Sequence, residues 1–237
     1  MPLSSALPRR RGPRRGDIKE RAILDTAERL LAEKPLREIG VDELAKGAGI
    51  SRPTFYFYFQ SKEAVLQALV ARIADEMQAA TEQWLERLHE DPRGVIASSV
   101  EAAATLWREH GPVMRAAVET WDSVPGMRPF WEAAVGRFVE VTSDKIREER
   151  ERGSAPPQPD ASALANALVW MTERCFYTTS LGADPALSER ELVPVLSEIW
   201  VRAIYGERLS DLDQQRDGAV VDQRHGHPRT EGAATRS

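Results

Sequence analysis

Cysteine is nearly absent from the sequence, since Cys175 is the only one in 237 residues. One cysteine excludes an internal disulfide and a zinc site built from several thiolates. Histidine is also scarce: His89, His110, His225 and His227 have no metal-ligand or nucleophile partner at a recognisable spacing. An enzyme therefore has little support, and we predict no catalytic residue, no metal site and no cofactor. His225 and His227 could bind a stray metal, but a solvated tail explains them better.

Long apolar runs are missing as well. No segment approaches the roughly 18 consecutive apolar residues that a membrane-spanning helix needs, so we expect no contact with a membrane. Arg9–Arg11 and Arg14–Arg15 could begin a twin-arginine export signal, but charged residues from Asp17 onward replace the apolar stretch of such signals. With a single cysteine, these features predict a cytoplasmic protein.

Sustained alternation of apolar and polar residues, the mark of strands, is absent too. Apolar residues instead recur three and four positions apart, which predicts an all-α fold. Pro- and Gly-containing breakers divide the chain into helices. The expected helices span residues 17–34, 41–47, 51–59, 61–88, 93–109, 112–122, 127–151, 160–181 and 188–205.

The net charge of −5 is unevenly distributed, because five arginines precede the first acidic residue. This segment, residues 1–16, is predicted to be a disordered basic arm that either contacts DNA phosphates or is only a solvated tail. Residues 209–237 are polar and lack periodicity, which predicts a disordered tail. Between them we expect a small domain at 17–62 and a larger helical domain at 63–208.

The helices expected at 41–47 and 51–59 are separated by three residues centred on Gly49. Glycine accepts the positive φ that a tight turn between helices demands. Ser51 is placed to cap the second helix, and Pro53 lies in its first turn, where a missing N–H costs nothing. The pair predicts a helix-turn-helix, whose second helix presents its N-terminal residues to base edges in the major groove.

Five successive aromatic residues, 55 to 59, lie in this second helix. Phe55 and Phe59 are one turn apart, and we expect them in the core of the small domain. Tyr56 and Phe57 are then left to face outward, where Phe57 could pack on a thymine methyl. The alternative is a purely structural aromatic cluster.

The segment VDELAKGAGISRPTFYFYF at 41–59, followed by SKEAVL at 61–66, resembles the DNA-binding signature of the TetR family. Arg52 could bond a guanine edge and Thr54 a base, while Tyr56, Tyr58 and Lys62 could reach phosphates. Gly40 departs from the family, which often has Ser or Thr there. The expected DNA-binding residues are Lys46, Ser51, Arg52, Pro53, Thr54, Tyr56, Phe57, Tyr58 and Lys62.

All six tryptophans lie outside the helix-turn-helix, in the larger domain. Large rings are either core or the walls of an apolar cavity. The resemblance implies such a cavity, whose ligand shifts the spacing of two DNA-binding domains. The expected residues for an apolar small-molecule effector are Trp107, Trp131, Phe138, Thr142, Met171, Thr172, Phe176 and Trp200.

Residues 45–59 and 199–207 look closer to a mycobacterial branch of the family. That branch has an asparagine pair on the penultimate helix, where this chain has Val169 and Thr172, so its ligand should not be copied across. The resemblance also implies a homodimer formed by the last two helices. A double-stranded palindromic DNA operator is the expected partner. The resemblance to the family is the only ground for expecting repression rather than activation. An interaction module without DNA binding would leave the exposed residues of the motif unexplained.

Overall fold

The computed structural model describes residues 15–85 and 88–206. The elements in this part are helices α1 (Arg15–Glu33), α2 (Val41–Gly47), α3 (Arg52–Tyr58), α4 (Lys62–Leu85), α5 (Pro92–Glu119), α6 (Met127–Glu151), α7 (Ala161–Ser180) and α8 (Glu189–Tyr205), with a 3-10 turn η1 at Leu36–Glu38. No strand occurs within these ranges, which confirms the all-α prediction. The predicted tail at 209–237 lies outside the described residues, as does the predicted arm except for its last two residues, which begin α1.

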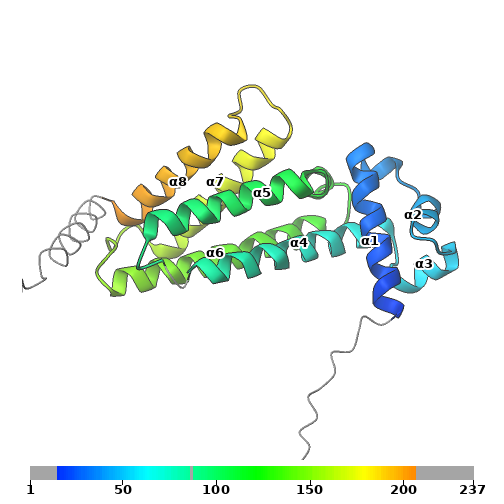
Figure 1. The fold of residues 1–237 in the computed structure, drawn as a ribbon, viewed down its shortest axis with the longest axis horizontal. Coiled ribbons are helices and arrows are strands. Elements are labelled where there is room, and N and C mark those ends of the chain that lie inside the picture. The colour runs from blue at the N-terminus through cyan, green and yellow to red at the C-terminus, as the bar shows by residue number, and fades with distance from the viewer. Residues whose placement is uncertain (1–14, 86–87, 207–237) are drawn as a thin grey trace, which may run out of the picture.

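The helices form a small head at one end of a longer body (Figure 1). Helices α1, α2 and α3 make up the head, and α4 leads from the head along the body. Within the body α5 packs against α4 on one side and against α7 and α8 on the other, while α6 contacts both α4 and α7. None of the described helices is long and apolar enough to cross a membrane.

Each of the three helices of the head contributes at least one almost completely buried side chain to its core. Ile23 of α1, Leu44 of α2 and Phe55 of α3 are almost completely buried. The turn between α2 and α3 depends on Gly49, whose φ of 66° is the left-handed conformation predicted for it. Gly47 has a different reason: a Cβ there would collide with Cγ2 of Thr26, so α1 and α2 approach too closely for alanine.

The helix ends follow their capping residues. Ser51 Oγ accepts a hydrogen bond from Thr54 N at 3.3 Å, and Ser61 Oγ accepts one from Ala64 N at 3.2 Å. Before α8, Glu191 accepts a hydrogen bond from Ser188 N at 3.0 Å and another from Ser188 Oγ, and these bonds lower the pKa of Glu191. The caps confirm that these helices begin where the sequence indicated.

One predicted boundary is wrong. The pair Gly111–Pro112 was expected to end one helix and begin another, but α5 continues through it to Glu119. Proline inside a helix costs about 3 kcal/mol because it removes one hydrogen bond and crowds the preceding turn. Gly111 before the proline and Val113 and Ala117 after it are buried, and the burial of this helix face offsets the cost of the proline.

Candidate functional site

The aromatic run of α3 is divided between the core and the outer face of the head. Phe55 and Phe59 are buried, with 0% and 8% exposure, whereas Tyr56 is 46% and Phe57 82% exposed. The Phe57 ring meets the Tyr58 ring edge to face, 5.2 Å between centroids, but most of its apolar surface is left in water. This face of α3 therefore presents a largely exposed aromatic ring beside polar groups.

The guanidinium of Arg52 is held in place at the start of the same face. Its NH1 donates to Asp42 Oδ2 at 3.0 Å and its NH2 to Tyr56 Oη at 3.5 Å, and these two partners raise the pKa of Arg52. The guanidinium also lies over the Tyr56 ring, 5.9 Å from its centroid. Arg52 remains half exposed, so a base edge could replace Asp42 as its partner without unfolding the helix.

The other residues expected on this face differ in exposure. Lys46, Ser51 and Pro53 are exposed, whereas Thr54 is half-buried and shares a 2.8 Å hydrogen bond with Ser51. Tyr58 is half-buried and packs against the core of the head. The exposed side chains of this set could reach a nucleic acid directly.

Lys62 makes contacts within the chain that the motif did not indicate, and its predicted phosphate contact stays a prediction. Its Nζ donates to the carbonyl oxygens of Leu36 at 2.7 Å, Ile39 at 3.0 Å and Arg37 at 3.2 Å. An ammonium group has three donors, and here the three carbonyls of the turn around η1 accept them. In this structure the Lys62 side chain therefore joins α4 to that turn rather than pointing toward a phosphate.

The body contains an apolar cavity with a volume of about 160 Å³. Its wall takes side chains from all five body helices, among them Met77 of α4 and Ile96 of α5. The indole of Trp200 on α8 lines the cavity and donates a hydrogen bond from Nε1 to Thr172 Oγ1 of α7 at 2.8 Å. The cavity is thus bounded by all five helices of the body.

The structure brings together most of the residues expected around the ligand. Six of the eight line this cavity: Trp107, Phe138, Thr142, Thr172, Phe176 and Trp200. Trp131 and Met171 do not line it. Trp131 is buried in the core, and Met171 is partly buried and packs against the core. On α6 the cavity is lined by Val135, Phe138 and Thr142, and Trp131, one turn before Val135 on the same face, lies beyond the cavity in the core. Val169, which occupies an asparagine position of the mycobacterial branch, also lines the cavity.

Sequence reasoning missed the charged residues of the cavity wall, Lys145 of α6 and Glu173 of α7. Glu173 stands four residues after Val169 and three before Phe176, at a position where helical periodicity calls for an apolar side chain. A glutamate between Val169 and Phe176 on an apolar helix face was therefore a signal in the sequence that could have indicated a charged group in the cavity wall. Burial raises the pKa of Glu173, and the neighbouring Arg174 only partly opposes that effect.

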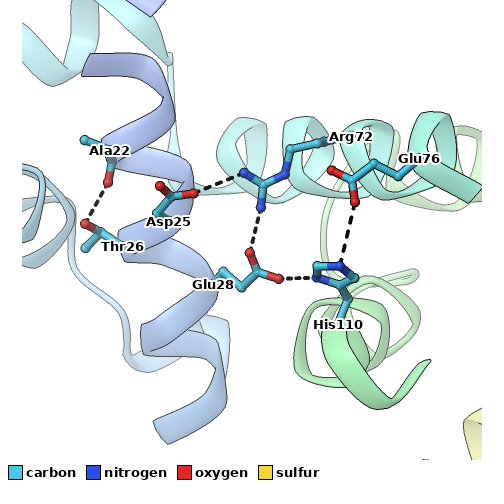
Figure 2. A network of polar contacts seen from close by, with 7 residues as sticks. All are labelled: Ala22, Asp25, Thr26, Glu28, Arg72, Glu76 and His110. Carbon is cyan, nitrogen blue, oxygen red and sulfur yellow. Dashed lines mark hydrogen bonds and ion pairs between the residues drawn. The ribbon is translucent and has the colours of Figure 1, made fainter. Parts of the chain in front are cut away.

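A network of charged side chains joins the head to the body (Figure 2). Arg72 of α4 bridges two acids of α1, donating to Glu28 Oε2 at 2.6 Å and to Asp25 Oδ1 at 3.2 Å. The other oxygen of Glu28 hydrogen-bonds Nδ1 of His110 on α5, and Nε2 of His110 lies 3.8 Å from Glu76 Oε2 on α4. We call these five residues the joint network; through it α1 contacts both helices that enter the body.

Comparison with known proteins decides what this combination is. Residues 23–69 match the family model of bacterial regulatory proteins of the tetR family, and residues 96–206 match the C-terminal domain of the transcriptional regulator EthR. The HTH-type transcriptional regulator EthR of Mycolicibacterium smegmatis is 40% identical over 191 residues, which cover 81% of this chain and 88% of that protein. EthR of Mycobacterium tuberculosis strain H37Rv is 39% identical over 206 residues, with coverages of 86% and 95%.

The chain belongs to the TetR family.

Both the family resemblance and the closer likeness to a mycobacterial branch are thereby confirmed. The fold agrees: a TetR-family regulator from Syntrophomonas wolfei superposes with a TM-score of 0.68 at 15% identity, over 81% of this chain and 98% of that one. The protein is a TetR-type helix-turn-helix transcriptional regulator with an EthR-type C-terminal domain. The relatives that show this are named as transcriptional regulators rather than enzymes.

Proposed function

We propose that this TetR-family regulator is a homodimeric, cytoplasmic repressor that binds a palindromic operator and is released by an apolar small molecule. Residues 17–62 read the DNA, and residues 63–208 bind the effector and form the dimer. The observation that carries the proposal is that one chain combines an exposed aromatic and basic face on α3 with an apolar cavity in the body.

The outer face of α3 enters the major groove. Arg52 exchanges Asp42 for the edge of a guanine, and Phe57 packs against a thymine methyl group. Tyr56 contacts the phosphate backbone, as do Tyr58 and Lys46. Ser51, Pro53 and Thr54 lie at the N-terminal end of the helix, where base edges come closest. Lys62 supports this face by holding the turn around η1.

The dimer uses α7 and α8. Val195 and Ile199 lie one turn apart on α8 and are 44% and 39% exposed, an apolar stripe that a second copy would cover. The function also favours two copies, because two recognition helices about 34–36 Å apart read two half-sites, whereas one head gives too little contact for strong selectivity.

The effector acts by binding one arrangement of the heads more tightly than another. The cavity touches all five body helices, and α4 and α5 also hold the joint network. A molecule that fills the cavity can therefore shift the two helices to which α1 is attached. Coupling between the two sites is reciprocal, so the operator must also weaken effector binding.

The test is a gel shift with the DNA immediately upstream of the protein's own gene. We expect a complex of one or more dimers, and a similar complex with variants at exposed body positions such as Glu140→Gln. Phe57→Ala and Arg52→Ala should each lose operator affinity at least tenfold, and Arg52→Ala should change the base preference. Equal losses on operator and random DNA would contradict base reading by Arg52, and absence of any shift with that DNA would count against the proposed function.

Dimerisation is tested separately by light scattering on the purified protein. We expect twice the chain mass for the wild type and a shift toward monomer for the double variant Val195→Glu, Ile199→Glu. The control places one negative charge on the exposed Gln60 of the head, as Gln60→Glu, and should remain a dimer, whereas Val195→Glu alone should already shift the protein toward monomer. A monomeric wild type that still binds a palindrome would rule out α8 as the interface.

A further inference from the structure

Glu173 is the one cavity-wall residue that combines deep burial, a charge and a lack of hydrogen bonds, within the part of the chain that the structure describes. Its side chain is 7% exposed, and neither carboxylate oxygen has a hydrogen-bond partner. It lies on α7 between Val169 and Phe176, both of which line the same cavity. A buried carboxyl group without a partner costs several kcal/mol when ionised, so its retention on a cavity wall calls for an explanation.

The cations near Glu173 are already engaged. Arg174 Nε lies 3.8 Å from Glu173 Oε2, too far for a hydrogen bond, and its guanidinium is stacked over the rings of Tyr177 and Trp121, 4.9 and 6.0 Å from their centroids. Lys145, the other charged residue of the wall, donates to Glu148 at 2.9 Å. Neither side chain therefore satisfies the carboxyl group, and its missing donor has to come from within the cavity.

We propose that the cavity binds a protonated amine with one ring-sized apolar group, and that Glu173 pairs with the ammonium of this ligand. The proposal deepens the effector site of the proposed function and rests on it. A cavity of about 150 Å³ lined by Leu, Ile and Phe holds benzene, so the 160 Å³ here suits one ring. The ring fills the apolar wall near Phe138 and Trp107, and a short chain carries the nitrogen to Glu173.

The same arrangement discriminates among ligands of equal shape. An ammonium supplies hydrogen bonds and a compensating charge, and a charge-assisted bond is about twice as strong as a neutral one. An alcohol supplies one neutral hydrogen bond. A carboxylate would place a second negative charge beside Glu173, which raises the cost of both. The expected order of affinity is therefore amine, alcohol, carboxylate.

Three probes of matched shape test this order on the full chain: 4-phenylbutylamine, 4-phenylbutan-1-ol and 4-phenylbutanoate. Binding is followed by calorimetry and by quenching of tryptophan fluorescence at pH 7.5, since Trp107 and Trp200 line the cavity. We expect the amine to bind at least tenfold more tightly than the alcohol, and the carboxylate most weakly. Glu173→Gln should weaken the amine at least tenfold while changing the alcohol by no more than about threefold.

The matched control is Glu140→Gln, which removes the same charge from an exposed position on α6 and should leave all three affinities unchanged. Circular dichroism and the melting temperature establish that each variant is folded. An alcohol that binds as tightly as the amine overturns the proposal, as does no measurable amine binding, or amine binding that survives Glu173→Gln in a folded protein.

The operator gel shift keeps this result separate from the proposed function. If the amine requires Glu173 but no operator is bound, the proposed function fails and the ligand class stands. If the operator is bound by the wild type and amine affinity is indifferent to Glu173, the ligand class fails and the regulator remains. Release of the operator by the amine, lost in Glu173→Gln, supports both.

Discussion

Nζ of Lys62 lies 2.7 Å from the carbonyl oxygen of Leu36, a bond that connects the first turn of α4 to η1 across 26 residues of sequence. With the carbonyls of Arg37 and Ile39 it gives one ammonium group three acceptors. Two of these bonds are partly buried, so the carbonyls would have little water to replace the ammonium. The position of α2 relative to α4 depends on this side chain.

Lys62→Met should therefore destabilise the head by roughly 1–3 kcal/mol, because partly buried acceptors lose a charged donor. Chemical denaturation measures the change, with Lys46→Met as the matched control at an exposed lysine of the same domain. The control should leave stability within about 0.5 kcal/mol. A Lys62 variant of unaltered stability that binds DNA with a smaller salt dependence would show instead that Lys62 contacts a phosphate.

Gly47→Ala should destabilise the protein by about 1–3 kcal/mol, because the new Cβ collides with Thr26 and α1 must move away from α2. Thr26→Ser removes the methyl group in the way, so the double variant should recover part of the loss. Gly136→Ala is the control: it lies inside α6 with open space around its Cβ and should gain about 0.5–1 kcal/mol. Additive losses in the double variant would mean that the collision is not the cause.

Arg72→Gln should reduce the effect of an effector on operator affinity more than it reduces either binding event alone. Arg72 connects α1 to α4, and without it the head follows the body less closely. Operator affinity is measured with and without 4-phenylbutylamine, and the ratio should fall toward one. Arg137→Gln breaks a 2.9 Å pair with Asp75 inside the body and should leave the ratio unchanged. An unchanged ratio for Arg72→Gln would place the coupling elsewhere.

Glu173 predicts an unusual dependence of stability on pH. Its pKa is raised by burial, so the folded protein holds the proton more tightly than the unfolded chain, whose carboxyl group has an ordinary pKa near 4.5. Stability contributed at this site is therefore present at low pH and lost as the pH rises through the folded-state pKa. Glu173→Gln should melt at a higher temperature than the wild type at pH 8 and at the same temperature near pH 4. A difference independent of pH would contradict this.

The sequence predicted the head more completely than the body, for physical reasons that individual residues show. A buried position on a short helix is set by local periodicity, so the separation of Phe55 and Phe59 from Tyr56 and Phe57 was readable. The capping role of Ser51 was readable for the same reason, since it involves only residues three apart.

The features that the sequence did not indicate all depend on contacts between distant parts of the chain. Lys62 carries a charge that suits a phosphate, and only the fold brings the carbonyl of Leu36 within its reach. Pro112 is a helix breaker by itself, and burial of its neighbours Val113 and Ala117 keeps α5 continuous. Trp131 is on the same face of α6 as Val135 and Phe138, but how far along that face the cavity extends is decided by the packing of the other body helices.

The length of α4 has a mechanical consequence. Its 24 residues, at 1.5 Å each, make a rod of about 36 Å, and Met77 at the cavity stands about 22 Å from the end that carries the head. A tilt of about 5° pivoting at the far end would displace the head end by about 3 Å, close to the rise of one base pair. A ligand no larger than a single ring could thus move a recognition helix out of register with its half-site, because the helix acts as a lever whose short arm lies in the cavity.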